Sequence, residues 1–218
     1  MPFKDRIEAG RRLAKALGRY KDDKPIVMAL PRGGVPVAAE VAAALKAPLD
    51  LILVRKIGVP FQTELAMGAV VDGPAPITIR NDDVIASCGV RDKEFEEVRR
   101  REIAEIERRR QRYLAGRPHP DVKGRTVIVV DDGIATGATT RAALQAIRES
   151  KAGKIVLAVP VAPDDTLEKL RGECDDIVCL ESHTFFGAIG AYYADFSQVS
   201  DDEVIALLDR TAAPTRPQ

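Results

Sequence analysis

The sequence has few cysteines and histidines and no excess of positive over negative charge. Its three cysteines, Cys88, Cys174 and Cys179, form no CxxC pair and no zinc-type spacing. An odd number of widely spaced cysteines predicts reduced thiols, as in a cytoplasmic protein. Lys and Arg (33) balance Asp and Glu (33), so no global basic field attracts nucleic acid or anionic membranes. Any binding of a polyanion must therefore come from a local patch.

Long apolar runs are missing as well. Residues 1–20 carry charges at nearly every turn and lack the apolar core of a signal peptide. No stretch approaches the roughly 20 apolar residues of a membrane span, so we expect a cytoplasmic protein without a membrane partner. The 218 residues suit one domain over residues 1–210, with a disordered tail at 211–218 that contains two prolines.

Short apolar runs alternate with helical patterns along the chain. Strands are predicted at residues 25–30, 49–54, 65–71, 127–130, 155–161 and 176–180. Helices are predicted at residues 5–19, 35–45, 140–150, 165–171 and 201–210. The strand runs are continuous rather than alternating, which is typical of strands that are buried on both faces. The sequence therefore predicts an α/β fold with a parallel central sheet flanked by helices.

One strongly charged segment, residues 91–112, interrupts this alternation. It contains Glu and Arg at i,i+4 spacing in the favourable order, at Glu96–Arg100, Glu97–Arg101 and Glu105–Arg109. One interpretation is a long solvated helix with many ion pairs, inside a helical insertion at about 80–120. The other is a lid or partner surface whose arginine clusters meet phosphates. The interleaved glutamates argue against a simple nucleic-acid surface.

The segment at 127–140 combines residues that suit a phosphate and a sugar. A buried strand ends in Asp131 and Asp132, at the edge where open α/β sheets bind ligands. Small residues follow and open a helix, so backbone N–H groups can surround an anion there. This loop consists of Ala135, Thr136, Gly137, Ala138, Thr139 and Thr140. The carboxylates would repel that anion and suit sugar hydroxyls or hydrated Mg²⁺, so the segment predicts a ribose 5-phosphate site.

Other phosphate-binding motifs do not fit this segment. A Walker A loop requires GxxxxGK[ST], but Gly133 and Gly137 are too close together and no lysine follows Gly137. The GxGxxG motif of dinucleotide-binding proteins is also absent. The remaining alternative is a plain Asp-Asp turn before a helix. Two adjacent carboxylates at a buried strand end need compensation to stay ionised, which disfavours that alternative.

Residues 127–139 closely resemble the phosphoribosyl pyrophosphate signature of type I phosphoribosyltransferases. Four apolar residues precede two acidic ones and a small-residue loop, although Gly133 stands where a branched apolar residue is more usual. The resemblance extends over about residues 5–210 and is strongest to uncharacterised bacterial phosphoribosyltransferase-domain proteins. It implies the type I phosphoribosyltransferase fold, with the charged helical insertion and a C-terminal hood at about 181–200.

The resemblance also implies an enzyme of nucleotide metabolism and assigns roles in it. The reaction would be Mg²⁺-dependent transfer of ribose 5-phosphate from phosphoribosyl pyrophosphate to a nitrogenous acceptor, with release of pyrophosphate. Asp131 and Asp132 would hold the ribose hydroxyls, and Mg²⁺ through these hydroxyls or water. The loop would bind the 5-phosphate. The residues assigned to the pyrophosphate are Arg32, Gly33, Gly34 and Lys56, and a simple Pro-Gly turn is the alternative. Homodimers are common in the family.

The acceptor remains open at this stage. Ala135 stands where 6-oxopurine enzymes of the family usually carry aspartate, which disfavours hypoxanthine or guanine and leaves adenine unassigned. In the expected hood, Phe185, Phe186 and Tyr192 would either stack a flat group or pack the C-terminal helix. The alternatives to a transferase are a phosphoribosyl hydrolase and a phosphoribosyl pyrophosphate sensor that binds RNA or DNA through residues 91–112. The zero net charge argues against nucleic-acid binding.

Overall fold

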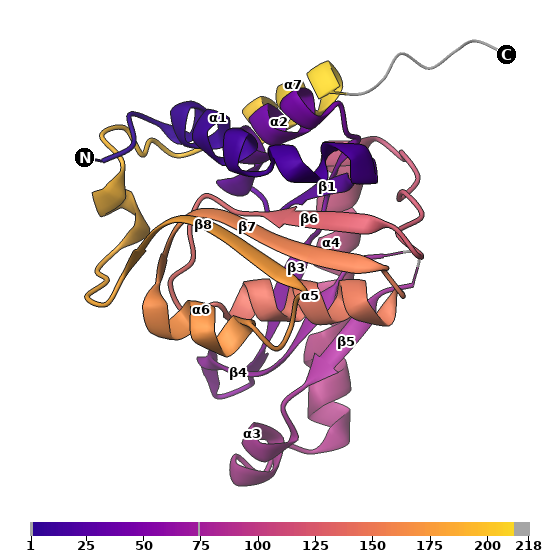
Figure 1. The fold of residues 1–218 in the computed structure, drawn as a ribbon. Helices are drawn as coiled ribbons and strands as arrows, with labels where there is room; N and C mark the ends of the chain where they lie inside the picture. The colour runs from indigo at the N-terminus through magenta and orange to yellow at the C-terminus, as the bar shows by residue number, and fades with distance from the viewer. Residues whose placement is uncertain (1, 74, 212–218) are drawn as a thin grey trace, which may run out of the picture.

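The computed structural model describes residues 2–73 and 75–211, which form two sheets with helices around them (Figure 1). The larger sheet is parallel, with the strand order β2-β1-β6-β7-β8. Its strands are β1 (Ile26–Ala29), β2 (Leu49–Leu51), β6 (Thr126–Val130), β7 (Lys154–Pro163) and β8 (Asp176–His183). The predicted α/β fold with a parallel central sheet flanked by helices is confirmed.

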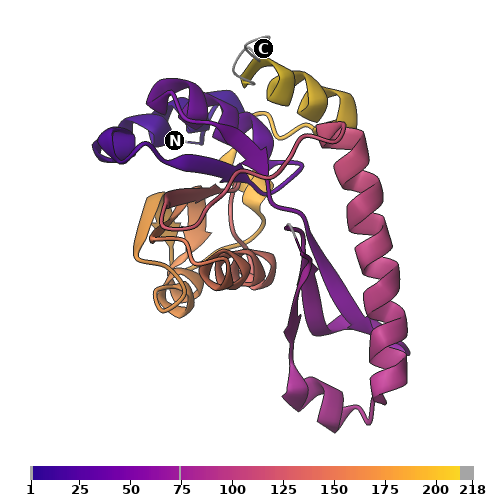
Figure 2. The same cartoon turned by 90° about the vertical axis from the view of Figure 1, so that its right-hand side faces the viewer.

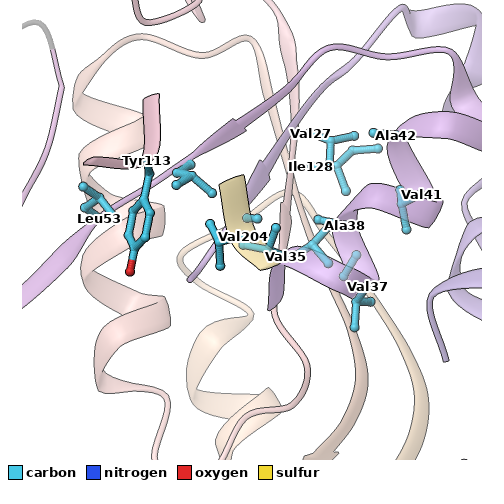
Figure 3. Close-up of a cluster of buried hydrophobic side chains, with 14 of the residues drawn as sticks. Val27, Val35, Val37, Ala38, Val41, Ala42, Leu53, Tyr113, Ile128 and Val204 are labelled. Atoms are coloured by element: carbon cyan, nitrogen blue, oxygen red, sulfur yellow. The ribbon is translucent and has the colours of Figure 1, made fainter. Parts of the chain in front are cut away.

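Both faces of the parallel sheet are covered, which explains the continuous apolar runs. The upper layer in Figure 1 holds α1 (Arg6–Ala16), α2 (Gly34–Leu45) and α7 (Asp201–Thr211); the lower holds α5 (Ala138–Glu149) and α6 (Asp164–Leu170). Val27 and Ile128 pack toward α2, as Figure 3 shows, whereas Met28 and Val129 belong to the core cluster between the sheet and α5. Successive strand residues thus alternate between two apolar cores.

A second sheet is antiparallel and consists of β3 (Val54–Val59), β4 (Gln62–Val71) and β5 (Ile77–Arg80). It extends away from the parallel sheet alongside α4 (Figure 2). The sequence analysis assigned the run at 65–71 to the parallel sheet; this was wrong, because it pairs in a hairpin with β3. The predicted strand at 49–54 is also divided, since Leu49–Leu51 is β2 and Val54 begins β3.

The predicted charged helix is α4 (Asp92–Leu114), which follows the short α3 (Asp82–Ser87). Phe95, Ile106 and Tyr113 on one side of α4 are buried, and α4 contacts β3, β4 and α7. On its outer side Arg101 Nη2 lies 2.5 Å from Glu97 Oε1, with more than half of both side chains exposed. The helix therefore supports the second sheet and presents an ion-paired face to solvent.

The rest of the chain connects these layers. A 3-10 helix, η1 (Gly18–Asp23), follows α1, and another, η2 (Ile189–Tyr192), lies in the expected hood segment. Thr211, which was expected in a disordered tail, ends α7; the remainder of that predicted tail, residues 212–218, lies outside the described residues. None of the helices described at 2–73 and 75–211 is long and apolar enough to cross a membrane.

Candidate functional site

Asp131 and Asp132 lie at the carboxyl edge of the parallel sheet, directly after β6. Asp132 Oδ2 accepts a hydrogen bond from Arg6 Nε at 2.7 Å, and only about a tenth of each side chain is exposed (11% and 10%). Asp131 Oδ1 accepts the backbone N–H of Asp132 at 2.9 Å. Desolvation and the neighbouring Asp132 carboxylate raise the pKa of Asp131. The charge of Asp132 is thus compensated by the Arg6 guanidinium. The charge of Asp131 would be stabilised by a hydrogen-bond donor or a cation that a ligand brings.

Arg6 is a site residue that the sequence analysis missed. Its Nη1 donates to the carbonyl oxygen of Ser197 at 2.8 Å, and its guanidinium carbon lies 3.8 Å from the centre of the Phe196 ring. The Tyr193 hydroxyl donates to the backbone carbonyl of Asp132 at 2.5 Å. Helix α1, the acidic pair and residues 193–197 are therefore tied together. No local pattern signals Arg6, because its partner Asp132 is 126 residues away in the sequence.

The small-residue loop keeps its backbone available at the start of α5. Gly137 is the N-cap of α5, with φ of 75°, and no side chain caps this helix end. A Cβ at Gly137 would lie 2.8 Å from Thr166 Cγ2, so glycine is required for space as well as for φ. The Thr166 hydroxyl donates to the carbonyl oxygen of Ala135 at 3.0 Å and holds the loop in place. The backbone N–H groups of the first turn of α5 are therefore available to a ligand, because no side chain caps this helix end.

The structure places the predicted loop residues in two environments. Ala135, Thr136, Ala138 and Thr139 are exposed, and Gly137 is half-buried. Thr140 is almost wholly buried at 2% exposure. The exposed part of the loop is thus residues 135–139, with Thr140 beneath it.

Two glycines bring the loop after β1 against the acidic pair. A Cβ at Gly33 would lie 2.0 Å from Asp132 Oδ2, and one at Gly34 would lie 2.8 Å from the carbonyl oxygen of Val130. Only glycine allows this approach at either position. The structure therefore places Gly33 and Gly34, predicted to receive the pyrophosphate, directly beside the acidic strand end.

The two basic residues predicted for the pyrophosphate lie apart from each other. Arg32, after the cis Pro31-Arg32 peptide, points toward the start of α7, with Nη1 3.6 Å from Asp201 Oδ1. Lys56 lies on β3, with Nζ 3.1 Å from Glu64 Oε2, and lines a cavity together with residues 136–139 of the small-residue loop. The structure thus groups Lys56 with the predicted 5-phosphate loop rather than with Arg32.

The predicted hood residues form part of an aromatic stack. Tyr192 stacks on His183 with ring centres 4.6 Å apart and on Phe186 at 4.9 Å. Phe185 is 94% exposed and takes no part in this stack. Nearby, η2 packs on the acidic strand end, because a Cβ at Gly133 would lie only 2.6 Å from Ile189 Cγ2. The hood therefore rests directly on the segment that carries Asp131 and Asp132.

The chain matches the model of a known protein family over most of its length. The model of the phosphoribosyl transferase domain matches residues 4–197, which is most of the chain. The chain belongs to this family. The predicted resemblance is thus confirmed at the level of the domain.

Two curated relatives of this phosphoribosyl transferase domain come from Mycobacterium tuberculosis, strains CDC 1551 and H37Rv, and are provisionally named phosphoribosyl transferases. Each is 48% identical over 208 residues, which is 95% of this chain and 46% of the relative. The chain thus spans about half the length of these relatives. Among solved structures, TT1426 from Thermus thermophilus is 40% identical with a TM-score of 0.85, covering 98% of this chain and 100% of that one. A full-length match of this quality shows the same fold.

Gly133 departs from the signature at a position where a Cβ would lie 2.6 Å from Ile189 Cγ2 and 3.1 Å from Val161 Cγ1. We expect Gly133→Ala to lower the free energy of unfolding by about 1–3 kcal/mol, because a new methyl group overpacks the hood against the strand end. Denaturant unfolding measures this effect. Gly172→Ala is the matched control, since no atom lies within 4 Å of a Cβ there.

A double-mutant cycle with Ile189→Ala tests the cause. Removing the Ile189 side chain leaves space for the new methyl group, so the double mutant should lose less stability than the sum of the single mutants. Strict additivity would contradict the contact between Gly133 and Ile189 as the reason for glycine.

Proposed function

We propose that this phosphoribosyl transferase domain is an enzyme that transfers ribose 5-phosphate from phosphoribosyl pyrophosphate to a nitrogenous acceptor. The observation that carries the proposal is the meeting of three features at one sheet edge. Asp131 and Asp132 lie beside the small-residue loop at the start of α5, and Gly33 lies against Asp132. Groups for sugar hydroxyls, for a phosphate and for a leaving group are thus close together.

In this proposal the protein positions the donor and stabilises charge. The backbone N–H groups at Gly137 and the first turn of α5 bind the 5-phosphate. Asp131 and Asp132 accept hydrogen bonds from the ribose hydroxyls and face the positive charge that develops on the ribose as pyrophosphate leaves. The raised pKa of Asp131 supports this role, since hydroxyl donors or a cation would offset the cost of its desolvated charge. Arg6 fixes the orientation of Asp132.

The same residues fit a magnesium ion that is held mainly by the substrate. Among residues 2–73 and 75–211 no three His, Cys, Asp or Glu side chains converge on a metal position. Mg²⁺ commonly uses one or two carboxylates and completes its octahedron with water and substrate phosphates. Arg6 already bonds Oδ2 of Asp132, so Asp131 is the better placed of the two carboxylates. When bound, Mg²⁺ would neutralise charge on the departing pyrophosphate.

We propose that the acceptor is a flat nitrogenous compound that stacks on Phe186, since His183 and Phe186 already cover the two faces of Tyr192. These rings belong to the hood, which contacts the acidic strand end through Ile189 and Gly133. Ala135 provides no carboxylate for a purine N7, so a 6-oxopurine is disfavoured. A cytoplasmic location and a homodimer remain predictions; the three cysteines, all free, are compatible with the first.

A pyrophosphate-release assay tests the proposed function. The protein is incubated with phosphoribosyl pyrophosphate, Mg²⁺ and a panel of nucleobases and other nitrogenous compounds. We expect release that depends on one class of acceptor, because the proposed donor site adjoins the hood through Gly133 and Ile189.

Each other outcome points to a different activity. Release without any acceptor would replace the transferase by a hydrolase. Donor binding without release under any condition would contradict the transferase and favour the sensor. RNA or DNA binding with a steep salt dependence would then identify the partner of that sensor.

A further inference from the structure

A cavity of about 360 Å³ lies next to the small-residue loop, on the side that faces the second sheet. One wall comes from β3, β4 and β5, and the other comes from the loop, α5 and α6. The volume is at the lower end of the range for small-molecule sites, roughly 300–1,000 Å³. The loop that we assign to the 5-phosphate therefore borders a space that can hold a further part of a ligand.

Every charged residue among the described ones that line this cavity is basic. Lys56 and Arg80 project from the second sheet, and Arg141 and Lys169 belong to α5 and α6 on the opposite wall. Cations on two facing walls with no acidic lining residue create a positive potential between them. The start of α5 adds the partial positive charge of its N-terminus at the same place. The cavity is thus suited to a group with several negative charges.

The carboxylates that pair with these cations are mostly exposed. Lys56 pairs with Glu64, whose side chain is 93% exposed, and Lys169 pairs with Asp165, which is 68% exposed. Ion pairs of this kind contribute little, so exchanging the carboxylate for a ligand phosphate costs little. Arg141 is the exception, because its partner Glu173, 3.4 Å away, is only 24% exposed. Arg80 resembles the two lysines, since its partners Asp82 and Asp92 are 80% and 90% exposed. Lys56, Lys169 and Arg80 are therefore the cations most available to a ligand.

A single phosphate on the loop carries at most two negative charges, fewer than the four cations that line the cavity can balance. We propose that the cavity binds additional phosphates joined to the 5-phosphate, so that the site accepts nucleoside 5′-diphosphates and 5′-triphosphates. This inference rests on the proposed function in one respect, namely that the loop binds the 5-phosphate. Such a nucleotide occupies the place of the donor and competes with it, so the domain is inhibited by nucleotides with longer phosphate chains.

Calorimetric titrations with ribose 5-phosphate, AMP, ADP and ATP test the inference. They are made without Mg²⁺, which would screen the phosphates, and the guanosine series is measured beside the adenosine series. We expect about tenfold tighter binding for each added phosphate, because each gains charge-assisted contacts with lysine or arginine. Lys56→Gln and Lys169→Gln, on opposite walls, should each reduce the ATP-to-AMP affinity ratio several-fold. Arg101→Gln removes the same charge from the outer face of α4 and should leave this ratio unchanged.

The outcomes separate this inference from the proposed function. If ribose 5-phosphate binds but ATP binds no more tightly than AMP, the inference is overturned while the proposed function stands. If Arg101→Gln reduces the ATP-to-AMP affinity ratio as much as Lys169→Gln does, the tighter binding of ATP comes from the overall positive charge and not from the cavity. The inference is then overturned as well. If neither ribose 5-phosphate nor any nucleotide binds, the loop assignment fails together with the inference.

Discussion

Replacing both Asp131 and Asp132 by asparagine is expected to lower the rate of pyrophosphate release by a factor of about 10³ or more. Asparagine keeps the shape of aspartate but removes the negative charge that would face the developing positive charge on the ribose. Removal of one preorganised electrostatic group commonly costs a factor of roughly 10²–10³, and two groups are removed here. The measurement is the pyrophosphate-release assay with saturating donor. Turnover near that of the unchanged protein would contradict the assignment of the acidic pair.

The single variants separate catalysis from stability. Asp131 has a raised pKa through desolvation, so Asp131→Asn should leave the fold intact or slightly more stable while activity falls. Asp132→Asn removes the partner of Arg6, and breaking a buried ion pair costs about 3–5 kcal/mol. Denaturant unfolding of both variants, measured beside activity, shows which loss comes from chemistry. Equal loss of stability in the two variants would contradict the difference between the two carboxylates.

Gly33→Ala is expected to lower activity about 100-fold and stability by about 3 kcal/mol. Its backbone φ of −60° is allowed for alanine, so the effect arises from space alone. The new Cβ would lie 2.0 Å from Asp132 Oδ2, and the carboxylate must turn away from Arg6 to avoid it. The loss of the ion pair gives the cost in stability, and the displaced carboxylate gives the cost in rate. Unfolding and pyrophosphate release measure the two effects.

Gly18→Ala provides the control for Gly33→Ala, because no atom lies within 4 Å of a Cβ at Gly18. It should be active and at least as stable as the unchanged protein. If Gly33→Ala behaves like Gly18→Ala, the close approach of the two loops is not what positions Asp132.

The sequence predicted the parallel sheet and the acidic strand end because these features are local. A strand buried on both faces, such as β6, is apolar over almost its whole length, and the loop and helix that follow have a recognisable residue pattern. The second, antiparallel sheet was not predicted. β3 contains Arg55 and Lys56 and is only partly buried, so its pattern resembles a loop. Its identity as a strand depends on pairing with β4 and support from α4, which a local pattern cannot show.

The site also contains relations that no local pattern predicts. The glycines at 33 and 34 suggested a turn, but the reason for Gly33 is the carboxylate of Asp132 from a distant strand. The resemblance suggested that Lys56 accompanies the pyrophosphate residues. The structure instead places it across a cavity from Lys169, because β3 crosses beside α5 rather than beside the loop after β1.

The contacts around Asp132 have a consequence for how the protein is made. Arg6 comes from the first helix and Tyr193 from a segment far along the chain, and both bond Asp132, while Ser197 holds Arg6. During synthesis the acidic strand end and its loop leave the ribosome about 60 residues before Tyr193, the partner that completes their surroundings. A nascent chain can thus form most of the parallel sheet while Asp132 still lacks part of its support. The contacts that surround Asp132 are therefore complete only after residues 193–197 have reached helix α1.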